Sequence, residues 1–382
     1  TAPIKFTNSY YNFGTTLGAD GNVYGAYSDA LANPDLTWET SEQFDAGFDA
    51  RFFDGRLNVN MDYYIKTTKD WLVQAPLPKT SGVSYQLING GDVRNSGLEL
   101  GFNWNDKIGK DFGYNAGFNF AYNKNEVTRI ANSDGIIHGT DGAGQLYDNS
   151  TEFYRSSVGQ PIGYFWGYKT AGIFQNKQEI DDWKAAENGI LQANVQPGDV
   201  KYIDVDHDNV IDDNDKVNLG NGMPDWTLGF SLGCDYKNFD FSMTANASLG
   251  NQIVQSYRNQ SNAKANYTTE ILGRWTGEGT SNHMPRITQS NINWLFSDLY
   301  IHDGDFLRIS NITLGYDFSK LLACQYVSEA RLYLQVQNAF TFTKYNGMDP
   351  EIGYGVNSWA SGIDLGYYPR PRTVLIGVNL KF

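Results

Sequence analysis

The chain has 382 residues, of which 41% are hydrophobic and 15% aromatic, and its formal net charge at pH 7 is −14. This acidic balance argues against nucleic acid as a partner and against docking on an anionic lipid surface. No apolar run approaches the roughly 20 residues of a membrane helix, so a strand-built barrel is the one membrane-spanning structure that the sequence permits.

Two further observations concern the class of protein. Cys234 and Cys324 lie far apart and form no C-x-x-C motif, so neither a disulfide framework nor a zinc site is indicated. The chain opens on Thr1 without a basic segment followed by an apolar one, so no signal peptide is visible. We expect the chain to be a fragment of a longer protein.

The first clear element is a long hairpin over residues 37–66. Bulky apolar side chains occupy alternate positions on both arms, and Asp54-Gly55 separates the arms. Side chains on a strand alternate between two faces, and Asp-Gly between two such runs is a strong hairpin signal. Each arm is longer than the usual soluble strand of about 5–6 residues. The hairpin therefore either packs on another sheet or faces lipid with an aqueous lumen behind it.

The same alternation returns farther along the chain, over residues 98–104, 112–122, 226–236, 239–249, 312–318, 332–336 and 374–382. The connections between these stretches alternate without exception between short and long. The short turns are 54–55, 105–111, 237–238 and 319–329, and the long loops lie near 67–97, 125–225, 250–303 and 343–371.

This order of connections is typical of outer-membrane barrels, which have short periplasmic turns and long extracellular loops. The polar positions are rich in Gly, Asn, Ser and Asp, which suits a lumen filled with water or a plug. The sequence therefore predicts an all-β fold, a transmembrane antiparallel β-barrel that continues through residues 1–382, rather than a soluble sandwich. We expect about ten strands, with two to four more inside the long loops and Phe382 at the periplasmic end.

An acidic stretch at residues 204–215 matches a twelve-residue calcium loop. Asn209 stands where glycine is usual, although Asn tolerates the left-handed backbone needed there, and an Asp replaces the final Glu. The alternative is an acidic, solvated turn. The candidate ligands are Asp204, Asp206, Asp208, Val210 through its carbonyl, Asp212 and Asp215.

No pattern in the sequence indicates catalysis. The G-x-S-x-G match at residues 229–233 falls inside an uninterrupted strand alternation, whereas a nucleophile elbow requires a strand-to-helix turn. The four histidines show no metal or triad spacing. We therefore predict that the protein is not an enzyme.

Nine short sequence blocks occur in a fixed order along the chain. They are Asn33-Pro34-Asp35-Leu36-Thr37-Trp38-Glu39, Asn95-Ser96-Gly97-Leu98-Glu99, Pro197-Gly198-Asp199-Val200-Lys201-Tyr202, Gly222-Met223-Pro224, Asp305-Phe306-Leu307-Arg308-Ile309, Leu314-Gly315-Tyr316, Asn338-Ala339-Phe340-Thr341, Met348-Asp349-Pro350-Glu351 and Tyr368-Pro369-Arg370. At these blocks the chain resembles the C-terminal part of SusC/RagA-family TonB-dependent outer-membrane transporters. The resemblance covers essentially all 382 residues.

The resemblance implies a 22-stranded barrel, an N-terminal plug with a TonB box, and a SusD-like lipoprotein lid that captures oligosaccharides or, in some members, peptides. The plug and the TonB box are missing from this sequence, so we expect a second piece of the same transporter to complete the barrel and to engage TonB. The expected function is energised nutrient import across the outer membrane, with membrane lipid around the barrel. The alternatives are a passive porin and a secreted β-rich glycan-binding protein.

Overall fold

The computed structural model describes residues 11–18, 21–28, 30–77, 79–83, 85–132, 134–139, 152–183, 192, 194–256, 268–288, 291–322, 326–352 and 361–382. Within these residues, no helix is long and apolar enough to cross a membrane.

Nine long strands form one antiparallel sheet in which each strand pairs with its neighbours in the chain. Their order is β4 (Thr40–Phe52), β5 (Leu57–Pro76), β6 (Tyr85–Ile108), β7 (Phe112–Ile130), β14 (Trp226–Tyr236), β15 (Phe239–Leu249), β18 (Phe306–Asp317), β19 (Glu329–Thr343) and β21 (Thr373–Lys381). The short strand β3 (Ala30–Leu31) pairs in parallel with β6 and completes a ten-stranded sheet. This meander is the arrangement that the alternating sequence predicts.

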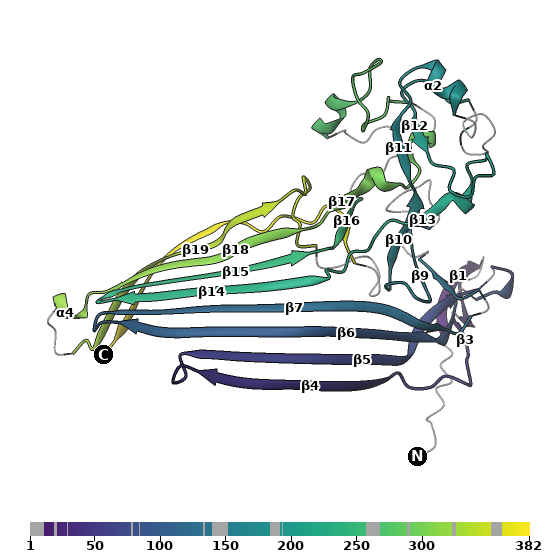
Figure 1. Ribbon diagram of the computed structural model, residues 1–382. Helices are drawn as coiled ribbons and strands as arrows, with labels where there is room; N and C mark the ends of the chain where they lie inside the picture. The colour runs from purple at the N-terminus through teal and green to yellow at the C-terminus, as the bar shows by residue number, and fades with distance from the viewer. Residues whose placement is uncertain are drawn as a thin grey trace.

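The two ends of the sheet differ, as Figure 1 shows. All the short connections between long strands lie at one end, together with the C-terminus, and the long connections leave from the other end. Three of the predicted long connections lie at this end, but the β5–β6 connection covers only residues 77–84 and is shorter than the 318–328 turn at the opposite end, so the alternation is not strict.

The predicted loop at 67–97 is wrong in extent, because β5 continues to Pro76 and β6 begins at Tyr85. Gly90 and Gly91 suggested a loop, yet both lie inside β6 at points of close approach. A Cβ on Gly90 would meet the Val73 side chain, and one on Gly91 would meet the backbone of β7. The register shifts within this extension, as it does at the β-bulges that bend long strands. The loop predicted to begin at 125 likewise starts later, after β7 ends at Ile130.

Within the described parts of the long connections, the additional strands are short and form separate small sheets. Barrel strands hidden inside these loops, as the sequence suggested, are not found among the described residues. The elements are β8 (Ile136–His138), β9 (Tyr154–Ser157), β10 (Tyr164–Tyr168) and β13 (Lys216–Asn218) in one sheet, β11 (Thr170–Ile173) with β12 (Val200–Tyr202), β16 (Gln252–Gln255) with β17 (Ile301–Asp303) and β20 (Ile363–Asp364), and the helix α2 (Lys177–Asp182).

The nine-stranded meander has no dry core of its own. Its apolar face leaves large side chains open to the surroundings, with Phe44 60% exposed, Phe48 55% and Leu334 43%. Its opposite face carries mostly polar side chains and glycine in alternation along the strands, with charged residues such as Asp49 and Arg51 on β4. An exposed apolar band of this extent is what a lipid-facing barrel wall requires.

The buried core lies instead in the long connections. Phe153, Phe165, Val254, Phe296 and Ile363 form one cluster, and each is at most 2% exposed. A second cluster packs Tyr168, Ile173, Val200, Tyr202 and Ile211 together. We call the described parts of residues 134–223, 250–303 and 345–366 the loop body, which stands beyond the strand ends at the right of Figure 1.

Candidate functional site

The acidic loop lies in the loop body between β12 and β13. Its hydrophobic residue Ile211 is fully buried in the cluster with Tyr168 and Tyr202, which fixes the loop on the sheet strands beside it. The loop ends in the short 3-10 helix η2 (Asp213–Asp215), and Lys216 then begins β13.

Three of the six predicted ligands come together. Oxygen atoms of Asp204, Asp206 and Asp208 lie within 4.8 Å of one another. The backbone N–H of Asn209 donates to Asp204 Oδ2 at 2.9 Å, and that of Val210 donates to Asp208 Oδ1 at 2.7 Å. Asn209 has a φ of 64°, so it adopts the left-handed backbone that the calcium-loop pattern requires at this position.

The other two carboxylates shape the backbone. Asp215 is fully buried, and its oxygens accept hydrogen bonds from the N–H groups of Val205 at 2.6 Å and Asp212 at 2.9 Å. Asp212 accepts from the N–H of Asn214 at 2.7 Å and caps η2. Sequence spacing alone did not reveal that these two side chains are already hydrogen-bonded within the loop.

The charges of the acidic loop are unevenly balanced. Lys216 Nζ lies 2.8 Å from Asp213 Oδ1, and this contact is the main reason why the pKa of Asp213 is lowered. The pKa of Asp206 is raised by partial desolvation and by the neighbouring carboxylates Asp208, Asp215 and Asp204, although a hydrogen bond from the Asp208 N–H acts to lower it. Asp204 Oδ1 is buried without a hydrogen-bond partner. The converging trio is therefore the part of the loop where negative charge stays uncompensated.

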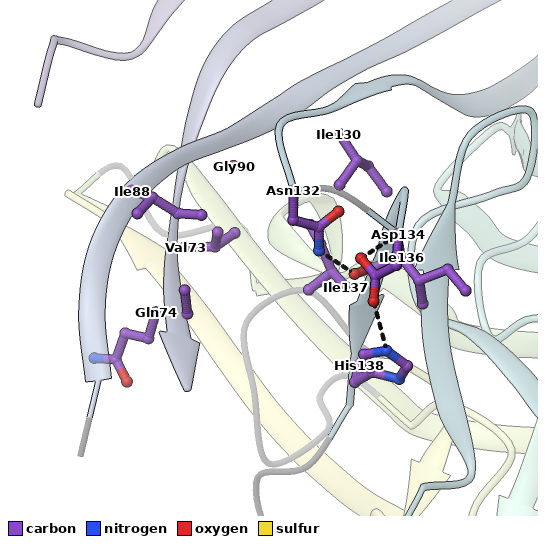
Figure 2. Close-up of a pocket in the computed structure, with 11 residues that line it drawn as sticks. Val73, Gln74, Ile88, Gly90, Ile130, Asn132, Asp134, Ile136, Ile137 and His138 are labelled. Atoms are coloured by element: carbon purple, nitrogen blue, oxygen red, sulfur yellow. Dashed lines mark hydrogen bonds and ion pairs between the residues drawn. The ribbon is translucent and has the colours of Figure 1, made fainter. Parts of the chain in front are cut away.

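A cavity of about 300 Å³ lies between the end of β5, the start of β6 and the segment 130–138 (Figure 2). Val73, Ile88 and Ile137 provide apolar lining, and Asp134 and His138 provide a polar edge. This cavity could not be predicted from the sequence, because its lining comes from stretches that were expected to be loops.

Polar contacts of one histidine hold the edge of this cavity. His138 lies between two carboxylates, with Nδ1 2.9 Å from Glu152 Oε1 and Nε2 3.3 Å from Asp134 Oδ2. Burial acts to raise the pKa of Asp134, but hydrogen bonds from the Ile136 N–H and His138 outweigh it and leave the pKa lowered. Both carboxylates already contact His138, so this edge of the cavity is a set of mutual contacts rather than a site with free ligand groups.

The residues considered for catalysis do not assemble a site. Ser231 lies in the middle of β14, paired with Gly117 on one side and Thr244 on the other, so the G-x-S-x-G match is a strand and no nucleophile elbow. Cys234 is an unpaired thiol on the same strand, and Cys324 lies outside the described residues.

The comparisons with known proteins identify the fold. Residues 2–216 match the family model described as TonB dependent receptor-like, beta-barrel. The chain belongs to this family. The family consists of outer-membrane transporters and receptors rather than enzymes, which confirms the expected location in the outer membrane.

Relatives support the finer resemblance to SusC and RagA. The chain is 33% identical over 99% of its length to TonB-dependent receptor P3 of Formosa agariphila, and 31% identical over 95% to TonB-dependent receptor SusC of Bacteroides thetaiotaomicron. It spans only 37% and 34% of these two relatives. The solved RagAB peptide transporter shares the fold, with a TM-score of 0.77 at 23% identity over 98% of this chain and 39% of that one.

Proposed function

We propose that this chain is part of a transporter that imports an oligosaccharide, or alternatively a peptide, with energy supplied through TonB. The observation that carries the proposal is the meander of nine long strands with one apolar face and one amide-rich face. Such a sheet fits a barrel wall between lipid and an aqueous lumen. The names of the relatives, a SusC receptor and a peptide transporter, support the two cargo classes.

The loop body has the position needed for cargo capture. All long connections leave the barrel wall at one end and share a buried core, so they form a folded surface rather than separate loops. We place this end outside the cell, where it seats a SusD-like lipoprotein lid and forms part of the cage around the cargo. The short turns then face the periplasm.

A second polypeptide segment completes the barrel. β4 and β21 form the two edges of the described meander, and each has only one long-strand neighbour. Unpaired strand edges in lipid are very costly. The plug-bearing part of the same transporter supplies the missing strands and the contact with TonB.

Transport by the complete transporter tests this function. Cells that carry it with its lid should accumulate fluorescently labelled oligosaccharides or peptides, and a protonophore should abolish the accumulation. Accumulation that persists with the protonophore would indicate a passive porin. A purified chain that stays monodisperse in buffer without detergent would indicate a secreted glycan-binding protein.

We also propose that Asp204, Asp206 and Asp208 hold a calcium ion, with the Val210 carbonyl completing part of the oxygen shell. The convergence of three carboxylates without a cationic partner and the orphaned Asp204 oxygen support this site. Asp212 and Asp215, which the twelve-residue pattern also nominates, then shape the loop through their backbone hydrogen bonds.

Terbium luminescence and calorimetry with calcium test the metal site. The double variant Asp206→Asn, Asp208→Asn should lose binding, whereas Asp181→Asn, on the exposed face of α2, should retain it. Equal binding by the two variants would show that the acidic loop is only a solvated turn.

A further inference from the structure

The strand register places uncharged polar residues side by side across the polar face. One row runs from β6 to β19 through directly paired positions: Asn103, Gly117, Ser231, Thr244, Asn311 and Gln337. The next row toward the short turns, from Asn105 on β6 to Gln335 on β19, also holds only amides, hydroxyls and glycine. We call these two rows the amide belt.

Charged groups lie outside the amide belt. On β4 the polar face carries Asp45, Asp49 and Arg51. Beyond the belt toward the short turns, Arg331 Nε donates to Asp240 Oδ1 at 2.8 Å. The polar face therefore holds an uncharged sector, the amide belt on β7, β14 and β15, and a charged sector on β4. Further charges stand at Asp62 and Glu99 on β5 and β6, and at the paired Asp235 and Asp240 toward the short turns.

The uncharged sector is also flat. A Cβ on Gly117 would meet the Ser231 hydroxyl, and one on Gly233 would meet the Asn115 amide. The same relation holds between Gly229 and Asn119. Polar side chains thus lie across the glycines of the adjacent strand instead of projecting away from the wall, which leaves more room in front of it.

The two sectors suit different neighbours. Fixed charges hold an opposing protein surface through charge-assisted hydrogen bonds, which are roughly twice as strong as neutral ones. Uncharged amides and hydroxyls exchange hydrogen bonds with water or with a polar solute at little net cost. A moving solute is therefore retained less on the amide belt than on the charged sector.

We propose that the solute passage opens against the amide belt on β7, β14 and β15, while the charged face of β4 stays against the plug. The passage suits an uncharged solute rich in hydroxyl or amide groups. This inference rests on the proposed function, because it needs a plug that moves within the barrel.

Cysteine labelling in the whole transporter tests the position of the passage. Ser231→Cys reports on the belt, Asp49→Cys on the charged sector and Leu232→Cys on the lipid face, each with Cys234 and Cys324 replaced by alanine. Membrane-impermeant maleimides of graded size are added to intact cells during import. We expect Ser231→Cys to be labelled at least tenfold faster than the other two variants. A shift in electrophoretic mobility on heating, the heat-modified gel band, confirms that each variant contains a folded barrel.

The outcomes separate this inference from the proposed function. Protection of Ser231→Cys in every state, or labelling of Asp49→Cys at an equal rate, overturns the passage assignment even if import is intact. Fast labelling of Ser231→Cys that a protonophore leaves unchanged supports the passage but overturns energised import.

Discussion

Arg308 shows how a single buried charge fixes the last long connection to the barrel wall. Its side chain is only 3% exposed at the outer end of β18. Its guanidinium lies 2.5 Å from Asp349 and 3.4 Å from Glu351, and Arg370 reaches Glu351 from the other side at 3.0 Å. Residues far apart in sequence are thereby joined at one point.

Replacing Arg308 by Met should loosen this connection. Removal of one partner from a buried pair leaves an unpaired charge on Asp349, and such changes cost about 3–5 kcal/mol. Protease protection of the loop body in urea measures the loss. Lys344→Ala is the matched control, because the Lys344 side chain is 87% exposed and its ion pair with Asp303 contributes at most about 1 kcal/mol. A loss no larger than that of the control would show that the Arg308 pair is not what holds the connection.

His302 on β17 should make the loop body sensitive to acid. Burial lowers the pKa of His302, an effect that His283 reinforces and Glu270 opposes. Because the folded pKa is below the unfolded one, the unfolded state binds more protons in acid, and stability falls as the pH drops below the unfolded value of about 6.5. The protection factors of the Ile253 and Val254 amides, that is, hydrogen exchange corrected for its intrinsic pH dependence, should fall between pH 7 and pH 5. The variant His302→Gln should flatten this response, and an unchanged pH dependence would exclude His302 as its source.

At the scale of single residues, the sequence predicted which residue types and backbone conformations the acidic loop needs, but not which hydrogen bonds its side chains form. Asn209 takes the left-handed backbone expected at a position where glycine is usual. The role of Asp215 was not predictable, because its two hydrogen bonds depend on the turn into η2 and on burial of the neighbouring Ile211. Spacing identifies acidic groups in a loop but does not show which of them the backbone already uses.

Among the elements, the long strands were the most predictable. β14 and β15 have the predicted bounds, because apolar alternation with a two-residue turn allows only one register. The end of β5, up to Pro76, and the start of β6, from Tyr85, were missed because glycines and bulges interrupt the alternation there. The short strands of the loop body were missed as well. Tyr168, for example, pairs with Lys216 across a long separation that no local pattern records.

The two faces of β19 should respond differently to the same charge. Leu334→Arg places a guanidinium on the apolar face near the middle of the strand, where it should destabilise the folded barrel by about 2–4 kcal/mol. Gln337→Arg places the same group on the polar face and should cost much less. Urea unfolding in lipid vesicles measures both variants. Equal losses would contradict the assignment of the apolar face to lipid.

As a whole, the molecule combines two kinds of stability. The barrel wall depends on its surroundings to cover apolar side chains, whereas the loop body buries its own. Phe165, fully buried among Phe153, Phe296 and Ile363, joins all three long connections. The family, the meander and the location were predictable from strand pattern and sequence blocks, but this shared core was not, because its members come from distant parts of the chain.

Phe165→Ala should therefore weaken the loop body and spare the wall. Loss of a fully buried phenylalanine costs about 3–5 kcal/mol. Limited trypsin digestion of outer-membrane vesicles, followed by mass spectrometry, should show new cleavages within residues 152–303 while the heat-modified gel band persists. The variant Leu272→Ala is the matched control, because Leu272 is 77% exposed and its loss should leave the cleavage pattern unchanged. Loss of the gel band in Phe165→Ala would mean that wall and loop body fold as one unit.

The core shared by Phe153, Val254 and Ile363 has a consequence for biogenesis. Ile363 lies shortly before the final strand, which begins at Thr373, so the cluster cannot close until nearly the entire chain has been made. The loop body must therefore complete its core after most of the hairpins of the meander have been made. A truncated product lacking its last connection would leave this core without Ile363, and proteases could then cut within the loop body.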